Sequence, residues 1–236
     1  DDTNLKIYNA SLSGKSLNGH VKEFQSWFSN IPNFKPDIII YYFGLNDRII
    51  RPDRWNDFKS NLNFFEKIYW NIGQRSFFYG KIKHIKDNFF FTQRDRYFTN
   101  DKDLIPKLKG NKFVSYEFAK SNYKIKSIEE KKVINHFKNN LKKLKDQLDN
   151  FNIKPIFITQ IKYDINGQKI LYFLNEELKE FSKRNNYDII KLDELINSPL
   201  NNSFIDAVHT NRKGSEEVSK ILYPELKKIL IGHYNN

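Results

Sequence analysis

The sequence predicts an α/β fold, a three-layer α/β/α sandwich around a mainly parallel sheet, with a helical insertion near 50–125. Short runs rich in Ile, Tyr and Phe alternate with segments whose apolar residues recur at helical spacing. This alternation is typical of βαβ crossovers in a parallel sheet. Two of the runs, at 35–44 and 154–160, are mostly apolar, as strands are when helices cover both faces of a sheet. The length of 236 residues allows one domain or two small ones. Because the alternation has no repeats and no low-complexity linker, we expect a single domain over 1–236.

The N-terminal part predicts a strand, a helix and a second strand. "LKIYNAS" predicts a strand at 5–10 that leads into a polar loop. The run "KPDIIIYYFG" predicts a buried strand at 37–43 that ends at a glycine. The helix between them presents four apolar side chains on one face, those of Val21, Phe24, Trp27 and Phe28.

The segment at 50–125 departs from this alternation and predicts a helical insertion with basic residues between its aromatic ones. We expect most of the aromatic side chains to be buried against the domain and a few to line the mouth of a cleft. Such a groove would suit an acidic glycan, whereas a cap that buries its own aromatic residues is the alternative. The residues concerned are Phe64, Phe65, Tyr69, Trp70, Phe77 and Phe78.

The C-terminal half returns to the alternation. Ser127 and Glu130 form a predicted capping box at the start of a long helix over 127–152. Strands are expected at 155–160 and 187–192, with a helix between them. The last helix contains Pro224, which should kink or break it. The apolar face of the long helix consists of Val133, Ile134, Phe137, Leu141, Leu144 and Leu148.

The composition excludes several kinds of site. The chain has no Cys, which excludes disulfides, thiolate metal sites and a cysteine nucleophile, and we expect no cofactor. No run approaches 18 apolar residues, so the sequence predicts no membrane span. The net charge of +12 invites a nucleic-acid partner. Lys is spread along most segments, however, as an AT-rich bacterial genome would produce, so the sequence does not favour that partner.

Polar clusters follow three of the predicted strands, and open α/β sheets bind ligands beyond the carboxyl ends of their strands. Gly14 lies in the loop after the first strand, where a backbone N–H can approach a ligand closely. Asn46 follows the second strand and can aim its amide at the same point, and two such donors form an oxyanion hole. Beyond the last strand, His209 is a candidate general base whose ring Asp206 can orient.

Each of these residues also has a purely structural explanation. Gly14 can serve a turn, and Asn and Asp in "GLND" can form a strand-end turn. Asp206 can cap a helical turn, and a lone His is more often structural than catalytic. The three clusters taken together, in this order, favour a catalytic site over these separate explanations.

Together the clusters resemble the SGNH (GDSL-type) hydrolase family over nearly the whole chain. The resemblance implies a flavodoxin-like sandwich of the SGNH-hydrolase type. It also implies that Asp206 and His209 are catalytic, that Gly14 and Asn46 bind the oxyanion, and that Gly44 and Asp47 support them. The matching residues are Gly14 in "NASLSGKS", Gly44, Asn46 and Asp47 in "YYFGLNDR", and Asp206, His209 and Gly214 in "DAVHTNRKG".

The sequence departs from the family at the nucleophile, because no Gly-Asp-Ser occurs in residues 1–236. The chain also contains no Met. We therefore expect the nucleophilic Ser, with the family's first strand, in a segment upstream of Asp1. Ser11, Ser13 and Ser16 lie near the predicted site, but their register belongs to the oxyanion block, so none is a good substitute.

The resemblance implies a serine esterase that acts on ester-linked acyl groups, commonly O-acetyl groups of carbohydrates. An O-acyltransferase to a glycan and a non-catalytic binding module of the same fold are the alternatives. The expected partner is a small-molecule or glycan ester, and contact with a membrane is expected only through an N-terminal anchor that has been removed. A cell-envelope or secreted location is favoured over a cytoplasmic one.

Overall fold

The computed structural model describes residues 6–10, 14–26, 28–32, 35–50, 113–161, 168–196, 198, 203–204 and 209–234. Among these residues, three strands form one parallel sheet in the order β1-β2-β3. The strands are β1 (Ile38–Tyr41), β2 (Lys154–Ile158) and β3 (Asp188–Ile190). They lie within the strands predicted at 37–43 and 187–192 and overlap the one predicted at 155–160, so the parallel sheet is confirmed.

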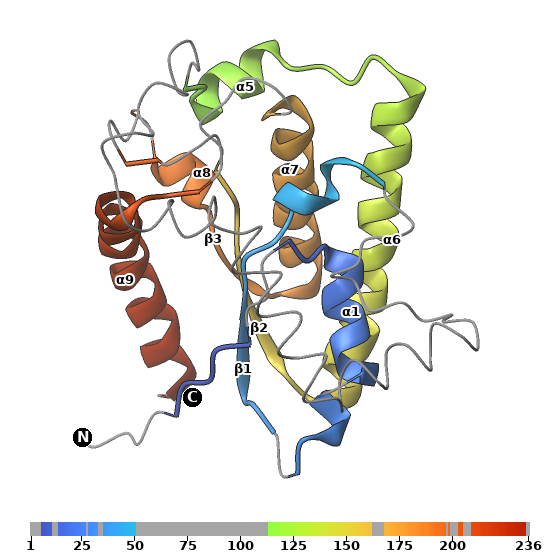
Figure 1. The fold of residues 1–236 in the computed structure, drawn as a ribbon, viewed down its shortest axis with the longest axis vertical. Coiled ribbons are helices and arrows are strands. Elements are labelled where there is room, and N and C mark those ends of the chain that lie inside the picture. Colours follow the sequence, from blue (N-terminus) through green and yellow to red (C-terminus); the bar gives the residue numbers. More distant parts are fainter. Residues whose placement is uncertain are drawn as a thin grey trace, which may run out of the picture.

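Helices cover both faces of this sheet, which gives the predicted three layers (Figure 1). One face carries α1 (Leu17–Ser26), α6 (Ile128–Phe151) and α7 (Gln168–Asn185). The other face carries α9 (Arg212–Tyr234), with α8 (Leu192–Leu195) beside it. The shorter helices are α5 (Tyr116–Asn122) and the 3-10 helices η1 (Phe28–Asn30) and η2 (Leu45–Arg48).

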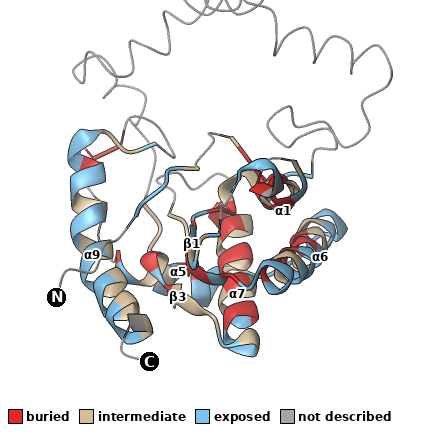
Figure 2. Ribbon diagram, turned by 90° about the horizontal axis from the view of Figure 1, so that it is seen from below, coloured by how far each residue is buried: buried red, intermediate tan, exposed pale blue. Residues whose placement is uncertain are grey.

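The core forms two apolar clusters, one on each side of the sheet. The larger cluster joins the sheet to α1, α6 and α7, and Figure 2 shows its buried residues concentrated along α1 and α7. The smaller cluster packs Ile156, Ile158 and Ile190 against apolar residues of α9. Apolar burial on both faces explains why the strands read as continuous apolar runs in the sequence.

The long helix is confirmed in detail. Ser127 and Glu130 form the capping box at the start of α6. The helix ends where Asn152 adopts the left-handed conformation, with φ of 52°, which Asn tolerates better than most residues. The predicted apolar face is buried at Ile134, Phe137, Leu141, Leu144 and Leu148, and Val133 is partly buried against the same cluster.

The predicted strand at 5–10 is wrong for the residues described. Residues 6–10 form no strand, and Ile7 and Tyr8 are 83% and 70% exposed. A run of β-branched and aromatic residues becomes a strand only where neighbouring strands and a core cover it. None of the described strands pairs with this segment.

Of the two outcomes predicted at Pro224, a kink or a break, the break does not occur, because α9 continues through this residue. Pro224 removes the hydrogen bond to the carbonyl of Lys220. Both residues are exposed, so water can donate to that carbonyl instead.

Trp27 and the insertion residues from Phe64 to Phe78 lie outside the described residues. In the part of the chain that the structure describes, no helix has the length and apolarity needed to cross a membrane.

Replacing Phe157 tests the central strand. The side chain is fully buried, with ring centroids 5.7 Å from Tyr41 and 5.8 Å from Phe43. Phe157→Ala should lower the free energy of unfolding by about 3–5 kcal/mol, because it removes a large apolar side chain from a packed core. Tyr223→Ala, at a residue 65% exposed, should change it by no more than about 0.5 kcal/mol. Urea unfolding of both variants measures the difference, and equal effects would contradict this packing.

Candidate active site

The loop before α1 holds Gly14 in a backbone conformation that suits glycine. Its φ is 80°, in the region that side chains with a Cβ rarely adopt. Lys15 and Ser16 follow and are buried, and Leu17 begins α1. The loop therefore turns sharply and leads into the N-terminus of α1, at the carboxyl edge of the sheet (Figure 1).

The turn after β1 binds directly to this loop. The Asn46 Nδ2 donates a hydrogen bond to the carbonyl oxygen of Lys15 over 3.1 Å. Both carboxylate oxygens of Asp47, which is buried, accept from the backbone N–H of Leu17 at 3.0 and 3.1 Å. An amide nitrogen carries two hydrogens, so the bond to Lys15 fixes the orientation of the Asn46 amide with one of them. The two predicted oxyanion segments thus lie side by side.

Gln160 is a supporting residue that sequence reasoning missed. It follows β2, and its side chain accepts from Leu45 N–H and donates to the carbonyl of Tyr42 over 3.2 Å. Gly44, between those two residues, has φ of 127°, which favours glycine. Gln160 therefore holds both sides of the Gly44 turn. Its place at the carboxyl end of a predicted strand, in "KPIFITQ", was the available signal.

Backbone contacts join the residues on either side of the segment that carries Asp206 and His209. Phe204 and Thr210 form an antiparallel bridge, and Asn211 N–H donates to the carbonyl of Ser203 over 3.0 Å. The Asn211 side chain accepts from Gly214 N–H at 2.9 Å and so caps the start of α9. Ser203 also donates through its hydroxyl to Glu217 on α9. These bonds fix the two ends of the segment on the first turns of α9.

The structure brings the loop that holds Gly14 next to the turn that holds Gly44, Asn46 and Asp47. The first turn of α9 lies at the same end of the sheet as η2 and the start of α1 (Figure 1). His209 is exposed, whereas Asp206 lies outside the described residues. The Asp206–His209 contact and the approach of His209 to Asn46 therefore stay predictions.

A pocket lined by tyrosines borders the Gly44 turn. Gln160 and Leu171 line it, and both lie next to Gly44, since a Cβ added to that glycine would be 3.7 and 3.6 Å from their side chains. The Tyr123 hydroxyl is buried without a hydrogen-bond partner among the described residues. Its aromatic lining residues are Phe113, Tyr116, Tyr123 and Tyr172, and Asn175 and Asp193 are among its polar ones.

A partly buried ammonium group, that of Lys179, lies beside one wall of this pocket. Lys179 Nζ lies 4.1 Å from the ring centroid of Tyr116 and forms ion pairs with Asp193 at 3.0 Å, Glu194 at 2.8 Å and Glu176 at 2.9 Å. Burial lowers the pKa of Lys179, but the three carboxylates outweigh it and hold that pKa above its usual range. Burial also raises the pKa of Tyr116 to about 12, so both groups stay protonated at neutral pH. Among the described residues, His, Asp and Glu side chains form no group that could hold a metal ion.

Two glycines of α9 give opposite predictions for the same substitution. A Cβ on Gly214 would lie 1.9 Å from the carbonyl oxygen of Ser203, whereas a Cβ on Gly232 would meet nothing within 4 Å. Gly214→Ala should lower the free energy of unfolding by about 1–3 kcal/mol, because the helix and the base of the segment must move apart. Gly232→Ala should raise it by up to about 1 kcal/mol, the ordinary gain in a helix. Thermal unfolding compares the two, and stabilisation by Gly214→Ala would contradict the close approach.

The comparisons with known proteins agree with this geometry. The family model for GDSL-like lipases and acylhydrolases matches residues 1–222, which confirms the resemblance and the type of fold. Neither the curated proteins nor the solved structures include a match to the chain. Because the family model covers nearly all of its residues, the chain belongs to the GDSL-like lipase/acylhydrolase family.

Proposed function

We propose that this protein is a serine-type esterase that removes acyl groups from carbohydrates, O-acetyl groups in particular. Membership of the acylhydrolase family supports the reaction class. The observation that carries the proposal is the 3.1 Å hydrogen bond from Asn46 to the carbonyl of Lys15. It places an amide donor next to the Gly14 loop, as an oxyanion hole requires.

In the proposed reaction, a serine Oγ attacks the ester carbonyl carbon while His209 accepts its proton. The carbonyl oxygen becomes an oxyanion, which the backbone N–H of Gly14 and the amide of Asn46 stabilise. Collapse of the tetrahedral intermediate breaks the ester C–O bond, and the departing alcohol takes the proton from His209. Water then attacks the acyl-enzyme in the same way and releases the acid. Asp206 holds the imidazole in the required tautomer.

Gly44 and Asp47 have supporting roles in this proposal. Asp47 holds the start of α1 through Leu17 N–H, and Gly44 makes the turn that presents Asn46. The Gly-Asp-Ser turn of the family has no counterpart in residues 1–236. We therefore assign no residue as the nucleophile. The proposed roles are those of the residues that activate the serine and of those that stabilise the oxyanion.

The tyrosine-lined pocket supports a carbohydrate as the alcohol part of the ester. Sugar rings pack their C–H faces on aromatic rings and direct hydroxyls to polar groups at the rim. Tyr116 and Tyr172, with ring centroids 5.9 Å apart, supply such rings. The buried Tyr123 hydroxyl supplies a polar group that still lacks a partner within the described residues.

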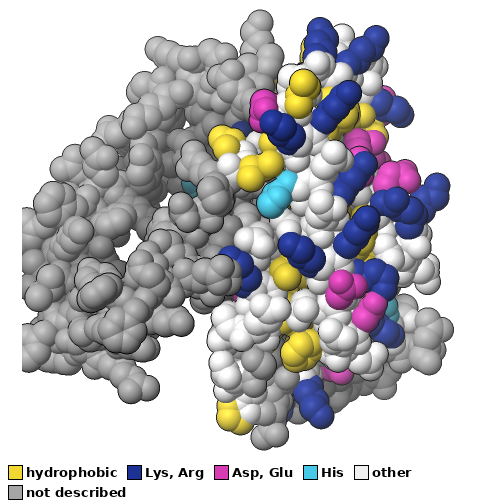
Figure 3. Space-filling view, turned by 90° about the vertical axis from the view of Figure 1, so that its right-hand side faces the viewer, with side chains coloured by type: hydrophobic (Ala, Val, Ile, Leu, Met, Phe, Trp, Pro, Cys, Tyr) yellow, Lys and Arg dark blue, Asp and Glu magenta, His cyan; other side chains and the backbone are white. Residues whose placement is uncertain are grey.

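The charge of the chain does not support a nucleic-acid partner. Figure 3 shows Lys and Arg side chains spread over the face that includes α6, with Asp and Glu between them. Lys132, Lys138 and Lys145 of that helix form ion pairs with carboxylates. A nucleic-acid site instead gathers unpaired cations into a stripe or patch. We therefore propose a glycan or small-molecule ester as the partner.

Esterase assays of the full-length gene product test the reaction. His209→Ala should lower kcat/KM for nitrophenyl acetate by on the order of a thousandfold or more, because the serine loses its base. His233→Ala is the matched control and should leave the rate unchanged. His233 pairs with Asp188 over 2.7 Å at the start of β3, away from the carboxyl edge of the sheet. Full activity of His209→Ala would exclude His209 as the base.

The substrate class needs a separate test. Tyr172→Ala should raise KM for an acetylated oligosaccharide about tenfold, which corresponds to about 1.4 kcal/mol, because it removes a ring that packs against the sugar. It should leave kcat/KM for nitrophenyl acetate unchanged. Release of acetate from both substrates measures this, with the exposed Tyr223→Ala as the control. Equal losses on the two substrates would contradict a sugar site at the pocket.

A further inference from the structure

Lys15 and Glu23 form a buried ion pair beneath the oxyanion loop. Lys15 Nζ bonds to Glu23 Oε1, and the two residues are only 4% and 2% exposed. A lysine normally extends its ammonium group into water. Buried ion pairs add little net stability, because desolvation of both charges offsets their attraction. A gain in folding stability therefore does not explain why this pair is buried.

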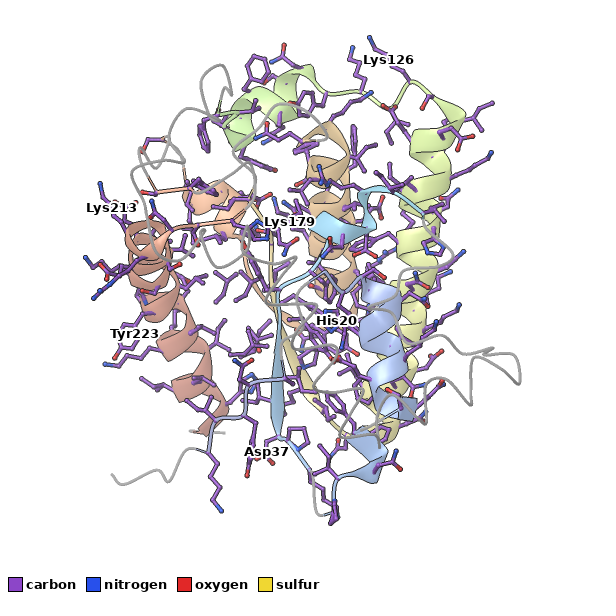
Figure 4. All side chains as sticks on the ribbon, in the orientation of Figure 1. His20, Asp37, Lys126, Lys179, Lys213 and Tyr223 are labelled. Carbon is purple, nitrogen blue, oxygen red and sulfur yellow. The ribbon has the colours of Figure 1, made fainter. Side chains whose placement is uncertain are left out.

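The second oxygen of Glu23 binds His20, so both carboxylate oxygens are engaged. The Glu23 Oε2 lies 2.9 Å from His20 Nδ1. The His20 ring lies against two residues at the end of β1, with centroids 5.8 Å from Tyr41 and from Phe43. Figure 4 shows His20 on the side of α1 that faces the sheet. Glu23 is thus held in place from the sheet through His20.

Tyr41 adds no competing negative charge to this cluster. Burial, and then the nearby charge of Glu23, raises the pKa of Tyr41 well above 10. The phenol therefore stays protonated at neutral pH and brings no charge to the cluster.

Lys15 connects this cluster to the proposed oxyanion site. Its side chain ends at Glu23, while its carbonyl oxygen accepts the hydrogen bond from Asn46. The next turn of the chain is held by Asp47 at Leu17 N–H. The peptide that orients the Asn46 amide is therefore fixed at one end by Asp47 and at the other by the buried ion pair.

We propose that Glu23 is a positioning residue: through Lys15 it holds the peptide that orients the Asn46 amide toward the oxyanion. This inference rests on the proposed function. Neither Glu23 nor His20 touches the reacting atoms in this scheme. The proposal explains why two charges are buried at a place where the net gain in stability is small.

The test replaces the whole pair, because removing one partner leaves a buried charge that can unfold the protein. In the full-length gene product, Lys15→Met combined with Glu23→Leu should keep the melting temperature within a few degrees. It should lower kcat for nitrophenyl acetate at least tenfold at unchanged KM, because the Asn46 amide is no longer held. Lys145→Met combined with Asp149→Leu, at an exposed pair on α6, is the matched control and should leave kcat unchanged. Unchanged kcat in the Lys15/Glu23 variant would overturn the proposal.

Two further measurements separate positioning from a general structural role. In an Asn46→Ala background the pair replacement should lower kcat no further, since coupled residues are not additive. The same loss in both backgrounds would overturn the proposal. NMR of the Asn46 side-chain amide should show shifted or broadened signals in the Lys15/Glu23 variant, and unchanged signals would overturn it too. A perturbed amide in a protein without esterase activity would refute the proposed function but support the positioning.

Discussion

The hydrogen bond that the N–H of Leu17 donates to the Asp47 carboxylate is the interaction on which the site depends. Both carboxylate oxygens take part, and the group is buried at the start of α1. The N-terminus of a helix carries exposed N–H donors and a partial positive charge, so a buried carboxylate is stabilised there. This bond ties the end of β1 to the beginning of α1. Asn46, one residue before Asp47, reaches Lys15 as a result.

The two halves of the proposed site rest on opposite layers of the sandwich. The oxyanion half belongs to α1 and the turn after β1, whereas the segment with His209 is fixed to the first turns of α9. Three parallel strands and their two apolar clusters separate the layers. The distance between the two halves is therefore set by packing through the sheet. A substitution such as Phe157→Ala can change the alignment of the site without touching it.

The sequence was informative where a feature depends on local pattern. The capping box of α6 and the apolar runs of β1 and β2 follow from residue type and spacing, and the structure contains them. The Gly44 turn and Gln160 lie together as the rule predicts, because parallel strands place their carboxyl ends at one edge of the sheet. The prediction of a strand at 5–10 was wrong because the apolar pattern of this segment does not show whether a neighbouring strand is present to pair with it.

The features that sequence reasoning missed depend on contacts between distant or charged residues. Lys15 and Glu23 would be expected in water on composition alone, and only the packing of α1 on the sheet shows that both are buried. Gln160 acts on a turn more than a hundred positions earlier in the chain, so its place at the end of a predicted strand did not reveal which residues it binds. The helix does not break at Pro224, because water can replace the lost hydrogen bond on an exposed helix face.

The charges around Lys179 nearly cancel, in a chain whose net charge is strongly positive. Lys179 pairs with Glu176, Asp193 and Glu194, and Lys191 also pairs with Glu194, so two ammonium groups meet three carboxylates in a chain of net charge +12. Charges in water act over a Debye length of about 8 Å at physiological salt. The sugar site that we propose at the tyrosines therefore offers little positive charge to a polyanion drawn to the basic surface, and it suits an uncharged sugar better than an acidic glycan.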